Sequence, residues 1–332
     1  MKSFWQELKA PFTILAPMEG VTDVVFREII AQIGRPDVFF TEFTNCDGLV
    51  SVGSEKVAQS LRFFNNQRPV VAQLWGANPE TFFLSAQFCK DLGFSGIDIN
   101  MGCPDKSMPK KGACSALINN PSLAKEIILA AKKGSGTLPV SVKTRLASSD
   151  LKSQEWFSFL LEQDLAALTI HLRTVEELSK VPAHWEYMLK IINLRNKIAP
   201  KTLIIGNGDI SSYSDVEDKY KLYGCEGYMI GRGVFTNPWI FNKNVDTNIS
   251  ILDRLDLYLH HIQLYEDTWG GLKNPANLKK FSKSYINNFP EASFLREKIM
   301  QCKNTKEMIE VISICKETLK QKRDLINPPK LL

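Results

Sequence analysis

Cys103 raises the first chemical question of this sequence, because it stands between a glycine and a proline where an apolar run ends. A cysteine kept for packing would lie inside the run. A thiol with the ordinary pKa of about 8.5 is mostly protonated at pH 7, so Cys103 could act as a general acid as readily as a nucleophile. The alternative is a buried, inert thiol, the role that we expect for Cys89, Cys225, Cys302 and Cys315, and we assign Cys114 a structural role as well.

Gln73 and Lys143 end two further apolar runs. An amide can both donate to and accept from the imide edge of a heterocycle, and a lysine beside the N1–C2=O region of a flavin stabilises the negative charge of the reduced ring. Lys143 also fits a Schiff-base lysine of an aldolase, which requires a lowered pKa. His171 could bind phosphate, hydrogen-bond a ring, or be a satisfied core histidine.

Two glycine-rich stretches, GNGDI (206–210) and GRGVFTNP (231–238), follow the last two apolar runs. Glycines beside a helix start let backbone N–H groups approach a phosphate, and the helix dipole favours the anion. Arg232 could add positive charge. Tight turns alone are the alternative explanation.

The elements that must position these residues alternate along the chain. Short, nearly all-apolar runs, as expected for parallel strands covered on both faces, cover 12–17, 38–43, 70–76, 96–100, 139–145, 167–174, 202–208 and 227–231. Helix-like stretches cover 22–33, 78–92, 120–133, 151–163, 185–198 and 213–223, the first three with cap residues Thr22, Asn78 and Asn120. The alternation predicts an α/β fold, a TIM (β/α)₈ barrel, with a doubly wound sheet as the alternative.

Beyond residue 245 the pattern is helical only, over about 250–270, 277–289 and 306–325. We therefore predict a barrel domain over 1–243 and an all-helical domain over 244–332, with the boundary near 243–248. Nearly every predicted strand ends on a polar side chain, which a purely structural barrel would not need.

Composition narrows the class of protein. The 332 residues are 44% hydrophobic, the seven cysteines form no C-x-x-C pair, and the four histidines form no zinc motif. No apolar run approaches the ~18 residues of a membrane span, so we expect a cytoplasmic protein. Because the histidines and cysteines form no metal-binding motif, we also expect no bound metal. Residues 270–332 hold 13 Lys and Arg against 6 Asp and Glu, whereas the rest hold 28 against 30. The basic tail is either a binding surface for a polyanion or a solvated lysine-rich surface.

A set of motifs resembles the tRNA-dihydrouridine synthases: LAPMEGVTD (15–23), TEF (41–43), AQLWG (72–76), DINMGCP (98–104), VSVKTRL (140–146), GNGDI (206–210) and MIGRGVFTNPWIF (229–241). These enzymes use FMN and NADPH to reduce the C5–C6 bond of a tRNA uridine. The resemblance makes Cys103 the catalytic acid and Asn100 and Arg145 contacts of the uridine. It assigns flavin binding to Pro17, Met18, Glu19, Gln73, Lys143, His171, Asn207, Gly208, Asp209, Gly231 and Arg232.

The helical tail is similar in size and position to the RNA-binding domain of that family, and NLKKFSKSYI (277–286), with Lys279, resembles the branch that modifies uridine 16. We expect a monomer that binds tRNA. The sequence departs from the family pattern in three places: Leu172 stands in place of a glycine, Asn45 stands where that branch carries a basic residue, and KKGACSAL (110–117) keeps only Gly112 where the family is richer in glycine. The alternatives are an FMN-dependent reductase of a small molecule, of the dihydropyrimidine or dihydroorotate type, and a non-catalytic tRNA-binding protein.

Overall fold

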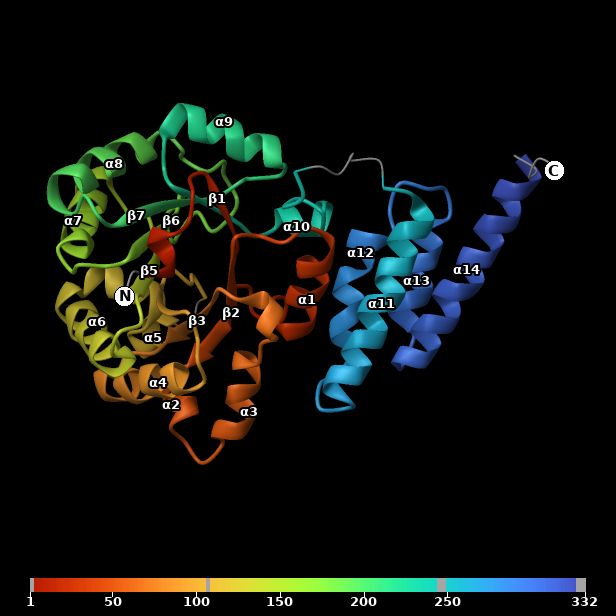
Figure 1. Cartoon of the computed structure of the whole chain (residues 1–332), viewed down its shortest axis with the longest axis horizontal. Coiled ribbons are helices and arrows are strands. Elements are labelled where there is room, and N and C mark those ends of the chain that lie inside the picture. The colour runs from red at the N-terminus through yellow and green to blue at the C-terminus, as the bar shows by residue number, and fades with distance from the viewer. Residues whose placement is uncertain (1–2, 106–107, 244–248, 327–332) are drawn as a thin grey trace. The chain divides into compact units, whose positions relative to one another are not determined.

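The computed structural model describes residues 3–105, 108–243 and 249–326 (Figure 1). The chain separates into two compact units, Met1–Gly233 and Val234–Leu332. The division falls ahead of the predicted boundary at 243/244, and the stretch 244–248 lies outside the described residues. Phe235 stacks on Phe281 with ring centroids 6.0 Å apart, so the segment after Gly233 packs with the helical unit.

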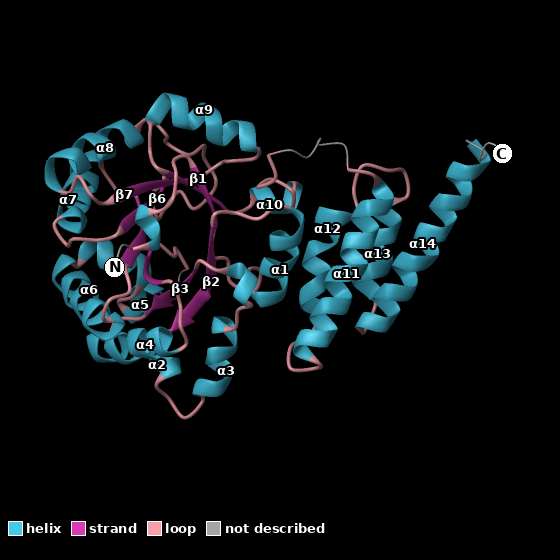
Figure 2. Ribbon diagram, in the orientation of Figure 1, coloured by secondary structure: helices cyan, strands magenta, loops and turns pink. Residues whose placement is uncertain are grey.

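The first unit is the predicted TIM barrel. Its strands close in chain order, each parallel to the next, and Figure 2 shows them in magenta inside a ring of helices. They are β1 (Phe12–Leu15), β2 (Val38–Asn45), β3 (Val70–Trp75), β4 (Gly96–Met101), β5 (Val140–Arg145), β6 (Ala167–His171), β7 (Leu203–Asn207) and β8 (Gly227–Ile230). The strands are buried along almost their whole length, which explains why they read as apolar runs rather than alternating patterns.

Helices surround the barrel where the sequence predicts them. The long ones are α1 (Val24–Ile33), α4 (Pro79–Asp91), α6 (Pro121–Ser135), α7 (Asp150–Leu161), α8 (Tyr187–Ile198) and α9 (Tyr213–Tyr223). Short helical turns lie between them: α2 (Cys46–Leu49), α3 (Ser54–Ala58), η2 (Gln59–Leu61), η3 (Asn65–Gln67), α5 (Met108–Lys111) and η4 (Cys114–Asn119). The turn η1 (Phe4–Gln6) precedes β1, and α10 (Gly233–Thr236) follows β8 at the division between the two units. Asn78 and Asn120 cap α4 and α6 through their side chains, as predicted.

The predicted cap of α1 is wrong by one residue. Asp23, not Thr22, accepts a hydrogen bond from the N–H of Phe26, at 3.0 Å. The Thr22 hydroxyl instead closes the loop after β1, because its oxygen accepts from the N–H of Met18 at 2.9 Å. Thr22 thus fixes the loop in which the predicted flavin contacts lie.

Strand β2 extends past its predicted end at residue 43 and carries an irregularity between Phe40 and Phe43. The bulged residue Thr41 accepts a hydrogen bond from the N–H of Gln73 at 3.1 Å. Bulges re-aim side chains, and the neighbouring Glu42 accepts from the N–H of Gly20 at 2.6 Å. Asn45 caps α2 by accepting from the N–H of Gly48 at 2.7 Å, a structural role for the residue that departs from the family pattern.

The second unit is helical throughout its described part, as predicted. It comprises α11 (Ile251–Trp269), η5 (Pro275–Phe281), α12 (Ser282–Tyr285), α13 (Ala292–Gln301) and α14 (Thr305–Ile326). Its core centres on stacked Tyr258 and Tyr285, whose rings are 4.8 Å apart, with His261 at 3.0 Å from the Tyr285 hydroxyl. Helix α13 was not among the predicted helices, and 277–289 forms a 3₁₀ helix and one short α-helix rather than a single helix.

Two structural features are absent from the described residues. No helix there has the length and apolar character needed to cross a membrane. Likewise, His, Cys, Asp and Glu side chains in the described ranges form no group of three or more that could hold a metal ion.

Candidate active site

The carboxyl ends of the barrel strands bring the predicted residues to one mouth. Register pairs Gln73 with Asp98, Asn100 with Lys143, Arg145 with His171, and His171 with Asn207 across neighbouring strands. Because all the strands are parallel, these side chains share the end at which barrel enzymes carry out their chemistry.

Asn100 holds the backbone that presents Cys103. Its carbonyl oxygen accepts from the N–H groups of Gly102 and Cys103, at 3.1 and 3.0 Å. Its amide nitrogen donates to Gln73 Oε1 at 3.1 Å. Asn100 is 6% exposed, so the turn that carries the thiol is fixed from inside the fold.

Asp98 completes this network, and the sequence analysis missed it. Its carboxylate accepts from Gln73 Nε2 at 2.8 Å and from the Ser141 hydroxyl at 2.6 Å, and the residue is fully buried. Burial raises the pKa of Asp98 to about 6, against hydrogen bonds from Ser141 and Gln73 and the charge of Lys143 that lower it. An acidic residue inside the apolar run GIDIN was the available signal.

The Cys103 thiol is more acidic than the sequence analysis assumed. A hydrogen bond from the Cys114 thiol is the largest influence and lowers the pKa of Cys103 to about 6, although burial opposes it. The N–H of Asp105 and the charge of Lys143 act in the same direction as Cys114. The sequence analysis did not foresee this second thiol, whose hydrogen bond makes Cys103 more acidic than an ordinary cysteine.

Lys143 lies half-buried at the centre of the mouth. Burial and then the charge of Arg145 lower the pKa of Lys143 to about 8, while Asp98 and Cys103 raise it. Arg145 is 9% exposed and donates from Nε to Gly102 O at 2.8 Å and from Nη1 to Leu178 O at 3.0 Å. Arg145 thus ties the Cys103 turn to the loop after β6, in addition to any contact with substrate.

His171 is neutral. Burial, followed by the charges of Lys143, Arg145, Arg173 and Arg232, lowers the pKa of its imidazole to about 2. Its Nδ1 is buried and has no hydrogen-bond partner among the described residues. His171 can therefore offer a neutral donor or acceptor to a ligand but not a positive charge.

Positive charge collects after β6, β7 and β8. Arg173, 2% exposed, donates to Asp209 from Nη2 and to Val181 O from Nε at 2.6 Å. Arg232 approaches the same carboxylate, with Nη2 3.3 Å from Asp209 Oδ1. Burial alone would raise the pKa of Asp209, but the hydrogen bond from Arg173, the Ala183 N–H and both guanidinium charges together lower it. The Asp209 side chain consequently orients two arginines rather than facing an anion itself.

Gly208 needs to be a glycine, whereas Gly231 is less constrained. Gly208 has φ of +140°, and a Cβ there would lie 2.7 Å from the Cβ of Ala183. At Gly231 an added Cβ would meet only Ala16 at 3.5 Å and Met18 at 3.7 Å. Asn207 is held by a hydrogen bond from its Nδ2 to Met229 O at 2.8 Å.

The remaining predicted residues of the barrel line the rim. Pro17 and Met18 are half-buried after β1, and Glu19 and Arg232 are exposed. Leu172, in place of the family's glycine, is fully buried, so its side chain packs inside the fold.

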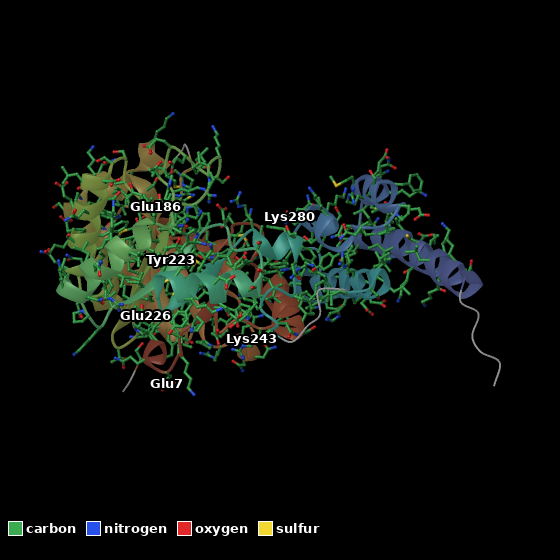
Figure 3. All side chains as sticks on the ribbon, turned by 90° about the horizontal axis from the view of Figure 1, so that it is seen from above. Glu7, Glu186, Tyr223, Glu226, Lys243 and Lys280 are labelled. Atoms are coloured by element: carbon green, nitrogen blue, oxygen red, sulfur yellow. The ribbon has the colours of Figure 1, made fainter. Side chains whose placement is uncertain are left out.

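Lys279 lies in the helical unit, where its Nζ donates to Met300 O at 2.8 Å. A separate groove of about 700 Å³ in the same unit, the cationic groove, is lined by Arg254, Lys280 and Lys283 together with Trp239, Asn287 and Asn288. Lys280 (labelled in Figure 3) and Lys283 are exposed. Lys279 is not among the residues that line this groove. Its neighbours Lys280 and Lys283, which do line it, are therefore better placed to bind a polyanion.

Comparison with known proteins decides the family. The sequence model of the family described as dihydrouridine synthase (Dus) matches residues 14–323. The chain belongs to the dihydrouridine synthase family. It is 46% identical over 313 residues, 93% of this chain and 94% of the relative, to a protein named "Probable tRNA-dihydrouridine synthase 2" from Bacillus subtilis (strain 168). A Staphylococcus aureus (strain COL) protein named "Probable tRNA-dihydrouridine synthase" is 44% identical over 320 residues, 95% of each chain.

Among solved structures, the fold is similar to that of 2-naphthoyl-CoA reductase in complex with 2-naphthoyl-CoA, with a TM-score of 0.54 and 11% identity. The match covers 71% of this chain and 50% of that one, and it supports the barrel fold alone. Membership of the family, in contrast, indicates the class of reaction, because dihydrouridine synthases are flavin-dependent oxidoreductases.

Proposed function

We propose that this protein reduces the C5–C6 double bond of a tRNA uridine, with FMN as cofactor, NADPH as reductant and Cys103 as the proton donor. The observation that carries the proposal is the placement of Cys103. Its turn is fixed by Asn100 and Arg145 at the end of β4, beside Lys143 and facing a mouth with unpartnered polar atoms.

The chemistry of the mouth fits FMN. Buried polar groups are almost always hydrogen-bonded, yet Thr169 Oγ1, His171 Nδ1 and Arg173 Nη1 have no partner among the described residues. These residues alternate along β6 and its end, so they face one side of the strand. A ligand with ring and phosphate acceptors would satisfy them. Gly208, which has φ of +140° and no side chain, keeps the backbone after β7 uncovered by a Cβ.

Each residue then has a defined role. Lys143 and Gln73 would hold the flavin ring, and Arg173 and Arg232, oriented by Asp209, would hold its phosphate. Neutral His171 would contribute a hydrogen bond there. Bound by these residues, FMN would supply hydride chemistry at C6 of the uracil, with NADPH as the reductant.

Cys103 completes the reduction by giving its Sγ proton to C5 as negative charge develops on the ring. A low thiol pKa strengthens the donor while reducing the fraction that is protonated, and catalytic acids work best with a pKa near the working pH. Lys143, close enough to influence both Cys103 and Asp98, keeps positive charge at the site of this transfer.

tRNA binding follows from the cationic groove. Exposed lysines neutralise phosphates, and an aromatic ring can stack on an unpaired base. One groove of the helical unit is lined by the exposed Lys280 and Lys283 and by the half-buried Arg254 and Trp239. The target uridine must leave its stack to reach a flavin, which costs a few kcal/mol and less in an irregular loop.

The test is formation of dihydrouridine. We expect the purified protein, supplied with FMN and NADPH, to convert a uridine of unmodified tRNA into dihydrouridine, which mass spectrometry of the nucleosides detects. Mass spectrometry of nuclease fragments of the same tRNA should locate the product at uridine 16. NADPH oxidation that does not depend on tRNA, with no dihydrouridine formed, would instead indicate a small-molecule reductase.

The lowered pKa of Lys143 is also what a Schiff-base lysine requires, so this alternative has one observation in its favour. Borohydride trapping separates the two. We expect no covalent adduct on Lys143 with carbonyl substrates, because Gln73, Asn100 and the donors of β6 have no role in an aldolase reaction.

A further inference from the structure

Cys114 has a backbone conformation that cysteine rarely adopts. Its φ of +54° lies in the left-handed region, which favours glycine, and the residue is fully buried. Unfavourable backbone conformations of this kind cluster at functional sites. A structural thiol, the role assigned from sequence, would not need to stand at such a position.

The neighbour of Cys114 is the proposed proton donor. Cys103 packs against the apolar cluster formed by Met108, Ala113 and Cys114. The Cys114 thiol also hydrogen-bonds the Cys103 sulfur. A disulfide requires the Cβ atoms of its two cysteines to lie about 3.5–4.5 Å apart, and side chains that share one cluster, as these do, need only local adjustment to reach that separation.

The two thiols differ in the way that a peroxide-sensitive pair requires. Cys103 is half-exposed and is the more acidic, whereas Cys114 is buried and its pKa is raised by the hydrogen bond with Cys103 and by burial. An acidic, accessible thiolate reacts first, and a second thiol at its side resolves the product. The remaining barrel cysteines, Cys46, Cys89 and Cys225, are buried, and burial raises the pKa of each.

We propose that Cys103 and Cys114 form a reversible disulfide when the protein meets hydrogen peroxide, and that this bond switches the enzyme off. The Cys103 thiolate attacks the peroxide, the O–O bond breaks, and Cys103 becomes a sulfenic acid with release of hydroxide. The Cys114 thiol then attacks that sulfur, forming the S–S bond and releasing water. Overall two thiols lose two electrons and two protons, and the peroxide is reduced to two molecules of water.

The consequence for activity rests on the proposed function. In the disulfide form Cys103 has no proton to give, so hydride transfer to uridine cannot be completed, while tRNA binding by the helical unit continues. A dithiol reductant reverses the bond. The pair would also protect Cys103 from irreversible oxidation to sulfinic acid.

The experiment treats purified holoenzyme with hydrogen peroxide, blocks free thiols with N-ethylmaleimide and maps the peptides by mass spectrometry. We expect a cross-linked pair of peptides carrying Cys103 and Cys114, and an intact mass lower by two hydrogens. Dithiothreitol should restore both thiols together with activity. The peptide result does not require an active enzyme, so failure on tRNA would count against the proposed function and not against the disulfide.

Two variants make the test specific. Cys114→Gly, which suits the left-handed backbone, should lose the cross-link and leave Cys103 to proceed to sulfenic and then sulfinic acid, beyond rescue by dithiothreitol. Cys315→Ser, in the helical unit, should behave as the wild type. If wild-type Cys103 proceeds to sulfinic acid as fast as in Cys114→Gly, or if peroxide leaves both thiols free, the proposal is wrong.

Discussion

The mouth of the barrel and the cationic groove of the helical unit both gather positive charge, but they hold it differently. In the mouth, Arg173 is 2% exposed and Arg145 is 9% exposed, and Nε and one terminal nitrogen of each donate to carbonyls or a carboxylate. In the groove, Lys280 and Lys283 are exposed to solvent. Buried, fixed charges act strongly on reacting atoms and shift pKa values, whereas exposed, flexible charges bind phosphates and are screened by salt.

This difference separates chemistry from substrate binding. Substitutions in the mouth should change rates, pH dependence and flavin affinity, with little effect of salt. Substitutions in the groove should change tRNA affinity and its salt dependence, and leave the flavin unaltered.

Replacing Cys103 by alanine should have the largest effect. Loss of a general acid slows the reaction by roughly 10²- to 10⁴-fold. Because Cys103 is neither one of the β6 donors nor part of the groove lining, flavin content and tRNA affinity should remain those of the wild type. Single-turnover formation of dihydrouridine, with tRNA binding measured in parallel, checks this. A variant that reacts at the wild-type rate would show that the proton comes from elsewhere.

Asp98→Asn should change how stability depends on pH. The pKa of Asp98 is about 6 in the folded protein, raised from 3.8, so between these values the folded state binds a proton that the unfolded state does not. Stability from this group therefore falls as pH rises from about 4 to about 6, by about 3 kcal/mol, and the ionised carboxylate remains a cost above pH 6.

Urea unfolding of wild type and Asp98→Asn across this pH range measures the difference. We expect the variant to gain relative to the wild type as pH rises. A difference in unfolding free energy that stays constant with pH would mean that Asp98 titrates normally.

Gly208→Ala should weaken both flavin binding and the fold. The new Cβ would lie 2.7 Å from Ala183 at a φ of +140°, a strain of about 1–3 kcal/mol. Gly231→Ala is the matched control, because its Cβ would meet neighbours at 3.5 Å or more. Flavin titration by fluorescence quenching should show weaker binding for the first variant and a near-normal value for the second. If both variants weakened flavin binding equally, the requirement for glycine at position 208 would be disproved.

Charge reversal in the groove should have the smallest effect on free energy but the clearest salt signature. Lys280→Glu with Lys283→Glu should weaken tRNA binding by roughly tenfold near 0.1 M salt and reduce the slope of log Kd against log salt by about 2. Lys303→Glu with Lys306→Glu changes the charge equally at exposed positions outside the groove lining. If both pairs behave alike, net charge and not the groove governs binding.

The barrel was predictable from sequence because its strands are buried and apolar and its helices begin at strong caps such as Asn78 and Asn120. The end of β2 was predicted too early, because its last two residues, Thr44 and Asn45, are polar and Asn45 also caps the following helix. Helix α13 was missed because half of its residues are polar or charged and only Ala292, Leu295 and Ile299 are buried.

The order of the motifs predicted which residues of the site lie at strand ends. The contacts between those residues could be found only in the structure. Nothing in the spacing shows that Asp209 is bound to Arg173 or that Lys279 is tied to Met300, because these partners come from different elements. The same holds for Cys114, which lies beyond the loop that follows Cys103 and meets it only in the folded chain. The pKa of Cys103 could not be predicted without that contact.

The most direct test of the division between mouth and groove is an absorbance spectrum recorded without air. NADPH is added to the flavin-loaded protein, and unmodified tRNA follows. We predict flavin bands that bleach with NADPH and return when tRNA is added, a slow return for Cys103→Ala, and a return that needs more tRNA for the variant with reversed charges at Lys280 and Lys283. Bands that bleach but ignore tRNA in the wild type would contradict the account.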